Sequence, residues 1–121
     1  MRIGYARDVQ STPALQTQID MLKSANCKKI FVSRRVLEKA DIMQTTNYFI
    51  REGEDTIVVC KLLCLDKSLK EMIIFFHQLD RLNFSFESIE DNLVIDRSQW
   101  DFAFSAIHLY QNLKGIKFED E

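Results

Sequence analysis

The sequence predicts an α/β domain built on a mostly parallel sheet of four to five strands flanked by helices. Short β-rich segments alternate with helical segments along the chain, which is the pattern of a mostly parallel sheet. One segment, residues 56–62 (TIVVCKL), is a nearly continuous β-branched and apolar run, typical of a strand covered on both faces. The length of 121 residues is enough for one domain.

The first predicted helix follows a strand at residues 2–6 (RIGYA). Residues 11–13 (STP) are typical of a helix start, because Thr12 can cap the helix and Pro13 can lie in the first turn, where its missing N–H costs nothing. Apolar residues at helical spacing then extend the helix to about residue 24. They are Leu15, Ile19 and Leu22.

The middle of the chain holds a second strand at residues 28–34 (KKIFVSR) and a weaker pattern after it. Residues 35–43 are poorly patterned, and we interpret them as a loop. Residues 44–51 (QTTNYFIR) favour a short helix that ends near Gly53.

A longer helix is predicted from about residue 66 to residue 82, and two short strands follow at 84–89 and 92–95. One apolar stripe marks this helix, formed by Leu69, Met72, Ile73, Phe76 and Leu79. Ligands of such sheets bind beyond the carboxyl ends of the strands. We therefore expect residues 7–11 and 62–67 to lie together at one edge of the sheet.

The last predicted helix, residues 98–114, has two apolar faces. Ser98 and Asp101 have capping-box spacing, with Asp in place of the usual Glu, and Gly115 is a good stop. One face carries Trp100, Ala103, Phe104, Ile107 and Tyr110, and the second carries Phe102, Ala106, Leu109 and Leu113. Because a helix on one sheet needs one apolar stripe, we predict a subunit interface here. The alternative is a helix sunk deeply in its own domain.

Composition and charge limit the function classes. The net charge is −2 and the chain ends in KFEDE, which argues against strong DNA binding by this chain alone. We find no membrane-spanning run and no signal peptide, so we expect a cytoplasmic protein. The three cysteines fit reduced thiols. Neither His77 nor His108 completes a ligand spacing with them, so no metal and no cofactor are predicted.

Four stretches together resemble one known family. MRIGYAR, LQTQIDMLKSANCKKIF, REGEDTIVVCKL and LDKSLKEMI are similar, in this order and spacing, to the catalytic domain of the serine recombinases, the resolvases and DNA invertases. The resemblance spans roughly residues 1–113. It implies an α/β domain whose last long helix makes the dimer contact. It also implies a serine that attacks a DNA phosphate to form a phosphoserine link, and arginines that stabilise the transferring phosphoryl group.

The chain matches the family at the scaffold positions but not at the position of the nucleophile. Arg7 matches the first family arginine, but the serine position falls on Val9. Another family arginine falls on Ile42. In the last helix, the family's Glu and Arg fall on Leu109 and Asn112.

The stretch at residues 61–68 also departs from the family at positions that carry chemistry. Where the family reads Lys-Leu-Asp-Arg-Leu-Gly-Arg-Ser, this chain reads KLLCLDKS. The family's Asp becomes Leu63, its Arg becomes Cys64, its Gly becomes Asp66 and its last Arg becomes Lys67. We therefore predict a vestigial pocket formed by Arg7, Val9, Ser11, Lys61, Leu63, Cys64 and Lys67.

The resulting interpretation is a catalytically inactive resolvase-like protein, residues 1–121, with a core at 1–97, an interface helix at 98–114 and an acidic tail at 115–121. It would form a homodimer, or a heterodimer with an active recombinase. The predicted interface residues are Trp100, Phe102, Phe104, Ala106, Ile107, Leu109, Tyr110 and Leu113. We find no segment that resembles a DNA-recognition helix.

Three alternatives remain open at this point. Ser11 could take the nucleophile position if the loop carries a two-residue insertion. Cys64 could act as a nucleophile if Lys61 and Lys67 lower its pKa. A nucleic-acid-binding accessory protein is the third alternative, with phosphate held along one edge by basic side chains. These are Arg2, Arg7, Lys61, Lys67 and Lys70.

Overall fold

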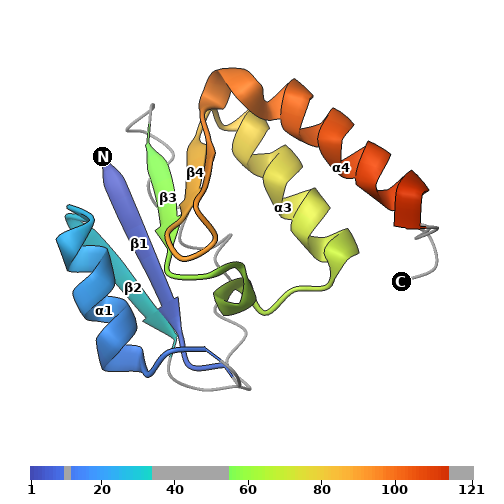
Figure 1. The fold of residues 1–121 in the computed structure, drawn as a ribbon. Coiled ribbons are helices and arrows are strands. Elements are labelled where there is room, and N and C mark those ends of the chain that lie inside the picture. The colour runs from blue at the N-terminus through green and yellow to red at the C-terminus, as the bar shows by residue number, and fades with distance from the viewer. Residues whose placement is uncertain (10–11, 34–54, 115–121) are drawn as a thin grey trace.

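The computed structural model describes residues 1–9, 12–33 and 55–114, which form a five-stranded sheet with helices on both faces (Figure 1). The strand order is β2-β1-β3-β4-β5. Neighbours among the first four strands pair in parallel, and β5 runs antiparallel to β4. The strands are β1 (Arg2–Arg7), β2 (Lys29–Ser33), β3 (Thr56–Val59), β4 (Ser85–Ser88) and β5 (Leu93–Ile95). The predicted α/β fold class and its mostly parallel sheet are confirmed.

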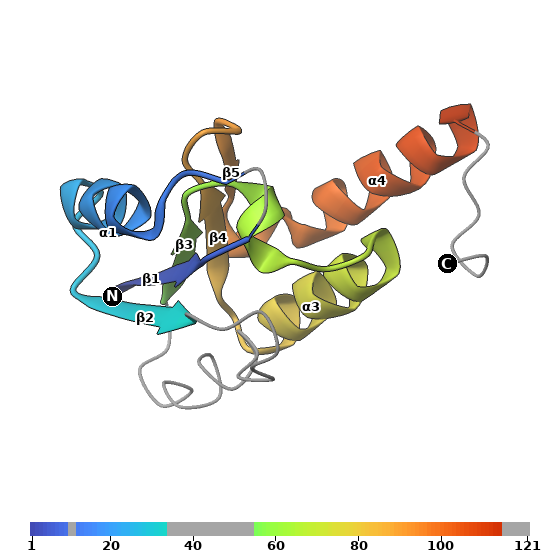
Figure 2. The ribbon, with the colours of Figure 1, turned by 90° about the horizontal axis from the view of Figure 1, so that it is seen from below.

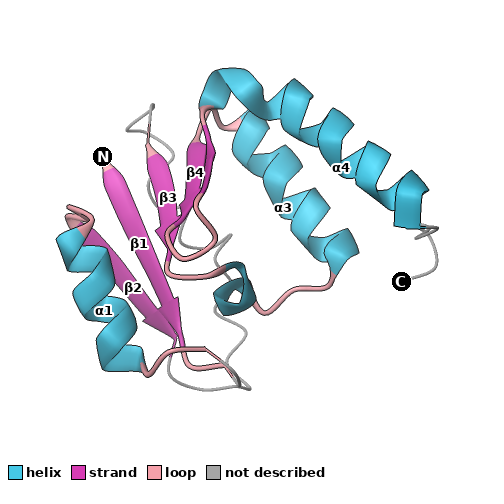
Figure 3. Cartoon of the chain, viewed as in Figure 1, coloured by secondary structure: helices cyan, strands magenta, loops and turns pink. Residues whose placement is uncertain are grey.

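The helices divide between the two sides of the sheet (Figures 2 and 3). They are α1 (Leu15–Ser24), α3 (Leu69–Arg81) and α4 (Trp100–Lys114), with short 3-10 helices η1 (Leu62–Leu65) and η2 (Arg97–Gln99). Both views show that the C-terminal end of α4 projects away from the strands. The predicted loop at 35–43, the helix at 44–51 and the tail at 115–121 lie outside the described residues.

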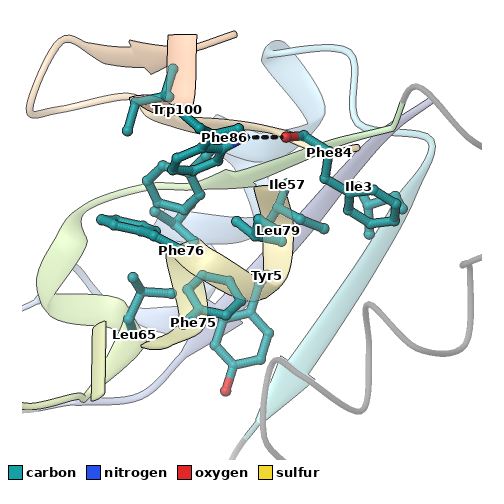
Figure 4. Close-up of a cluster of buried hydrophobic side chains, with 12 residues drawn as sticks. Ile3, Tyr5, Ile57, Leu65, Phe75, Phe76, Leu79, Phe84, Phe86 and Trp100 are labelled. Atoms are coloured by element: carbon teal, nitrogen blue, oxygen red, sulfur yellow. Dashed lines mark hydrogen bonds between the residues drawn. The ribbon is translucent and has the colours of Figure 1, made fainter. Parts of the chain in front are cut away.

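Side chains alternate between the two faces of each strand, so every second residue of β1 and β3 joins the core on the α3 side of the sheet. Ile3 and Tyr5 of β1 face α3, together with Ile57 and Val59 of β3. Aromatic rings fill the space between the sheet and the helices (Figure 4). They belong to Phe75, Phe76, Phe84, Phe86 and Trp100.

The opposite face of β1 is made of small residues, which lets α1 pack closely. Ala6 and Val58 contact Leu22 of α1 in a second buried cluster. A Cβ added at Gly4 would lie 3.1 Å from Leu22 Cδ1, tighter than ordinary van der Waals contact. The glycine therefore fixes how near α1 lies to the sheet.

Two predicted helix caps are wrong. Ala14 is the residue before α1, and no side chain caps the helix. Thr12 Oγ1 instead donates a hydrogen bond to the Val9 carbonyl at 2.6 Å. At the last helix, Asp96 rather than Ser98 is the cap, because its carboxylate accepts from the Ser98 N–H and forms a capping box with Gln99 around η2.

The region after β3 also differs from its prediction in detail. β3 ends at Val59, earlier than predicted, since the following residues turn into η1. α3 begins at Leu69, where Ser68 Oγ accepts from the Glu71 N–H and the Glu71 side chain accepts from the Ser68 N–H. This capping box places the helix start at the first residue of the apolar stripe, three residues later than the predicted start at about residue 66.

Candidate functional site: a pocket at the strand ends and the outer face of α4

The carboxyl ends of β1 and β3 lead into the candidate site. Arg7 ends β1, and the buried amide of Gln18 holds this end: it accepts from the Arg7 N–H at 3.1 Å and donates to the Arg7 carbonyl at 2.9 Å. The same amide donates to the Pro13 carbonyl at 2.9 Å. Gln18 belongs to α1, so these hydrogen bonds fix the position of the chain where it leaves β1 relative to that helix.

A pocket of about 280 Å³ lies where these ends meet. Its described lining consists of Val9, Leu62, Leu63, Asp66, Lys67, Ser68 and Met72. The expected meeting of the segments after β1 and β3 is thus observed for the described residues. Val9, the position that the resemblance aligns with the family's serine, brings a hydrocarbon side chain to the pocket. The Ser68 hydroxyl lines it too, but it serves as the α3 cap.

The Arg7 side chain forms an ion pair with Asp66, which is one of the residues that line the pocket. The arginine side chain is 12% exposed, and its Nε lies 3.5 Å from Asp66 Oδ2. Its Nη1 donates to the Tyr5 hydroxyl at 3.1 Å. Asp66 ends η1 in the left-handed backbone region, with φ of 52° and ψ of 48°. The only routine occupants of that region are Gly, Asn and Asp.

Three described residues of the predicted pocket, Arg7, Lys61 and Cys64, do not line it. Cys64 is fully buried, and burial raises the pKa of its thiol, which disfavours the reactive thiolate. Lys61 Nζ lies 3.8 Å from Glu90 Oε2 instead. Ser11 lies outside the described residues. Val9, Leu63 and Lys67 do line the pocket, and Arg7 adjoins it through Asp66.

Sequence reasoning placed residues 62–67 at this edge but left Leu62 and Asp66 out of the predicted pocket, and it did not select Ser68 or Met72. The replacement of the family's Gly by Asp66 was the available signal, because Asp tolerates a left-handed turn and adds a charge. The predicted basic edge also needs correction. Arg2 lies at the opposite end of β1 from Arg7 and forms an ion pair with Glu87 at 2.8 Å.

The inner face of α4 packs within its own domain. Trp100 is buried, and its Nε1 donates to the Phe84 carbonyl at 2.8 Å (Figure 4). Phe104 stacks on His77 of α3 with ring centroids 3.9 Å apart, and Ile107 packs against the same core. The assignment of Trp100 to a subunit interface is therefore wrong, since its own core encloses it.

The outer face of α4 stays apolar and exposed. Phe102 and Leu113 are 78% and 77% exposed, and Leu109 and Tyr110 are also exposed. Ala106 lies on the same side, beside an open groove of about 380 Å³ between α3 and α4. Met72, Ile73, Phe102, Ala106 and Ile107 are among its lining residues. The predicted second apolar face thus exists as a surface.

A comparison with protein families decides the assignment. A family model described as the N-terminal domain of resolvase matches residues 2–115. The chain belongs to the resolvase family. The resemblance inferred from the four sequence stretches is therefore confirmed.

Three curated relatives of this resolvase-family chain are named as a DNA-invertase or resolvase of a transposon. It is 34% identical over 100 residues to the transposon Tn552 DNA-invertase BinR of Staphylococcus aureus, covering 81% of this chain and 52% of the relative. It is 33% identical over 101 residues to the Tn552 resolvase of the same species, covering 81% and 50%. For the Tn917 resolvase of Enterococcus faecalis the identity is 32% over 109 residues, covering 88% and 59%. The chain spans about half the length of these relatives.

Within residues 1–9, 12–33 and 55–114, no group of three or more His, Cys, Asp or Glu side chains could hold a metal ion. None of the helices in those ranges has the length and apolar character needed to cross a bilayer.

Proposed function

We propose that this chain is a catalytically inactive resolvase-family protein that acts in DNA recombination by associating with a second resolvase-type domain. The partner is another copy of the chain or an active recombinase. The observation that carries the proposal is Val9 at the pocket between the ends of β1 and β3.

The chemistry of the pocket supports inactivity. Phosphoryl transfer by this family needs a serine nucleophile, and an isopropyl side chain cannot form the covalent phosphoserine link. Loss of a single electrostatic donor typically costs on the order of 10²–10³ in rate. Here Val9 and Leu63 replace the nucleophile and a carboxylate, and Arg7 is already paired with Asp66.

The outer face of α4 supports association. Large apolar side chains that stay exposed in one domain favour a protein partner, because burying them removes apolar area from water. The groove beside α4 continues this surface with Met72 and Ile73 of α3. An apolar helix that lies next to an apolar groove is self-complementary, so the same surface can serve on both subunits of a symmetric pair.

The test of association is sedimentation equilibrium of the wild-type chain and of Phe102→Glu and Leu113→Glu. We expect a reversible dimer for the wild type and a shift to monomer for both variants, since each would bury a charge in the interface. Asn112→Glu, which changes an exposed polar residue of the same helix, is the matched control and should remain dimeric. A wild-type chain that stays monomeric at high micromolar concentration contradicts self-association.

The heterodimer is tested with a relative as the probe. Tagged Tn552 DNA-invertase BinR, mixed with the untagged wild-type chain, should retain it on a column, and Phe102→Glu should abolish retention. If only the self-associated form is found, the partner is a second copy of this chain.

The test of inactivity is an incision assay on supercoiled plasmid carrying recombination sites of the relatives. We expect no nicking and no covalent protein–DNA adduct. An adduct that disappears in Ser11→Ala would instead establish a residual recombinase that uses Ser11 and would overturn the proposed inactivity.

A further inference from the structure

The turn after η1 carries a charge that its backbone does not require. Asp66 adopts φ of 52°, a conformation that Gly adopts without strain and Asn tolerates about as well as Asp. A neutral residue could therefore make the same turn. What the aspartate adds is a carboxylate 3.5 Å from Arg7 Nε.

We propose that Asp66 is an internal anion that closes the Arg7 guanidinium to phosphate groups from outside. This inference rests on the proposed function and deepens it. The proposed function leaves the pocket without a nucleophile, and Asp66 would in addition neutralise the arginine that adjoins it, while Lys67 stays in the pocket lining.

The surroundings of Arg7 favour this role. Its side chain is 12% exposed and is held by the Tyr5 hydroxyl at 3.1 Å, so the guanidinium has little freedom to move toward a ligand. The Asp66 side chain is 45% exposed and lines the pocket. A phosphate that approached Arg7 from the pocket would therefore meet the carboxylate first and would have to displace a like charge.

A second ion pair on the same edge also places a carboxylate beside a cation that could otherwise bind phosphate. Lys61, next to η1, lies 3.8 Å from Glu90 in the turn before β5. Asp91 in the same turn accepts from the Leu62 N–H at 2.8 Å and from the Ser88 hydroxyl at 2.6 Å. Carboxylates thus accompany both the end of β1 and the start of η1, where a phosphate-binding edge would present cations.

The experiment measures phosphate binding by the wild-type chain and by Asp66→Asn. Inorganic phosphate is titrated at constant ionic strength, balanced with chloride, while NMR follows the Arg7 Nε–H signal and the backbone amides of residues 66–68. We expect saturable shifts in Asp66→Asn, with an affinity on the order of tenfold tighter than in the wild type, because a like charge and a competing ion pair are both removed.

Three further variants make the result specific. Asp66→Gly keeps the left-handed turn without a side chain and should behave as Asp66→Asn does, which covers a failure of one variant to fold. Asp8→Asn removes an exposed negative charge next to Arg7 and should behave as the wild type does. The double variant Arg7→Gln with Asp66→Asn should lose the gained phosphate binding.

Two outcomes would overturn the inference. One is a wild-type chain that binds phosphate as tightly as Asp66→Asn. The other is folded Asp66→Asn and Asp66→Gly that bind no better than the wild type. Neither outcome bears on DNA incision, which the supercoiled-plasmid assay measures separately, so failure of this inference and failure of the proposed inactivity are distinguishable.

Discussion

At the scale of single residues, Gln18 connects α1 to the end of β1 through one buried amide. We expect Gln18→Leu to lower the free energy of unfolding by about 2–3 kcal/mol, because the Arg7 N–H and carbonyl and the Pro13 carbonyl lose these hydrogen bonds in a buried site. Urea unfolding followed by circular dichroism measures the change. The end of β1 should also loosen, which faster amide exchange at Arg7 would report.

Gln16→Leu is the matched control for this prediction. Gln16 is exposed, and its amide donates only to the exposed Asp20 carboxylate in the described contacts, at 3.0 Å. The same chemical change should therefore alter stability by less than about 0.5 kcal/mol. Equal losses in the two variants would contradict the role given to Gln18.

The Cys60 thiol makes the free energy of unfolding depend on pH in the alkaline range. Burial, and next the Glu90 carboxylate, raise its pKa from 9.0 to about 12. A thiol whose pKa is raised on folding stabilises the native state fully below pH 9, and this contribution is lost as pH rises from about 9 toward 12. Its share of the decline reaches at most about 1.4 kcal/mol per pH unit.

Urea unfolding between pH 8 and the alkaline limit of the native state tests this prediction. Cys60→Ala removes this thiol, so its stability should decline less steeply above pH 9 than that of the wild type. Some decline should remain, because Cys27 and Cys64 are present in both chains. Identical slopes would mean that the Cys60 thiol does not carry the effect.

The residue scale also shows the limit of sequence reasoning. The loss of the nucleophile at Val9 could be read directly, because the YAR segment aligns without a gap. The ion pair of Arg7 with Asp66 could not, since it depends on a left-handed turn that brings the end of η1 back to β1. Cys64 was placed in the pocket by its sequence neighbours, whereas η1 turns its side chain into the core.

At the scale of elements, α4 combines a buried face and an exposed face in one helix. We expect Trp100→Ala to cost about 3–5 kcal/mol in stability, because it leaves a cavity between α3 and β4 and removes the hydrogen bond to the Phe84 carbonyl. Phe102→Ala should change the stability of the monomer by less than about 0.5 kcal/mol and should instead weaken association.

Chemical unfolding at a protein concentration below the dimer dissociation constant separates the two effects. Sedimentation velocity of the same variants then reports association. A large loss of monomer stability in Phe102→Ala would show that its ring packs within one domain, and the outer face of α4 would no longer support a partner.

Element existence followed well from the sequence, while element ends did not. The five described strands and the three described α-helices were each anticipated, β3 from an unbroken β-branched run and the helices from apolar stripes at helical spacing, whereas the 3-10 helices η1 and η2 were not. The caps failed at α1 and α4, where local hydrogen bonds decided the start: Thr12 bonds back to Val9, and Asp96 caps a 3-10 turn before α4. The two faces of α4 were visible in sequence, but which of them the domain covers depends on where α3 lies.

At the scale of the whole molecule, two cations near the pocket form ion pairs within the chain, and the exposed outer face of α4 is apolar. Arg7 and Lys61 form ion pairs within the chain, and the net charge is −2. A surface of this kind favours association through apolar burial, which depends weakly on salt, over phosphate binding, which depends steeply on it.

Salt dependence therefore provides a test of the molecule as a whole. Between about 50 and 500 mM salt, where the screening length falls severalfold, we expect the dimer dissociation constant to change by less than about threefold. Cooling should weaken the dimer, because the hydrophobic contribution declines at low temperature. Fluorescence anisotropy of labelled duplex DNA should show no saturable binding at the low-salt end. Duplex binding that falls steeply with salt would mean that the ion pairs of Arg7 and Lys61 open for phosphate, and would move the role of the chain from protein association to contact with DNA.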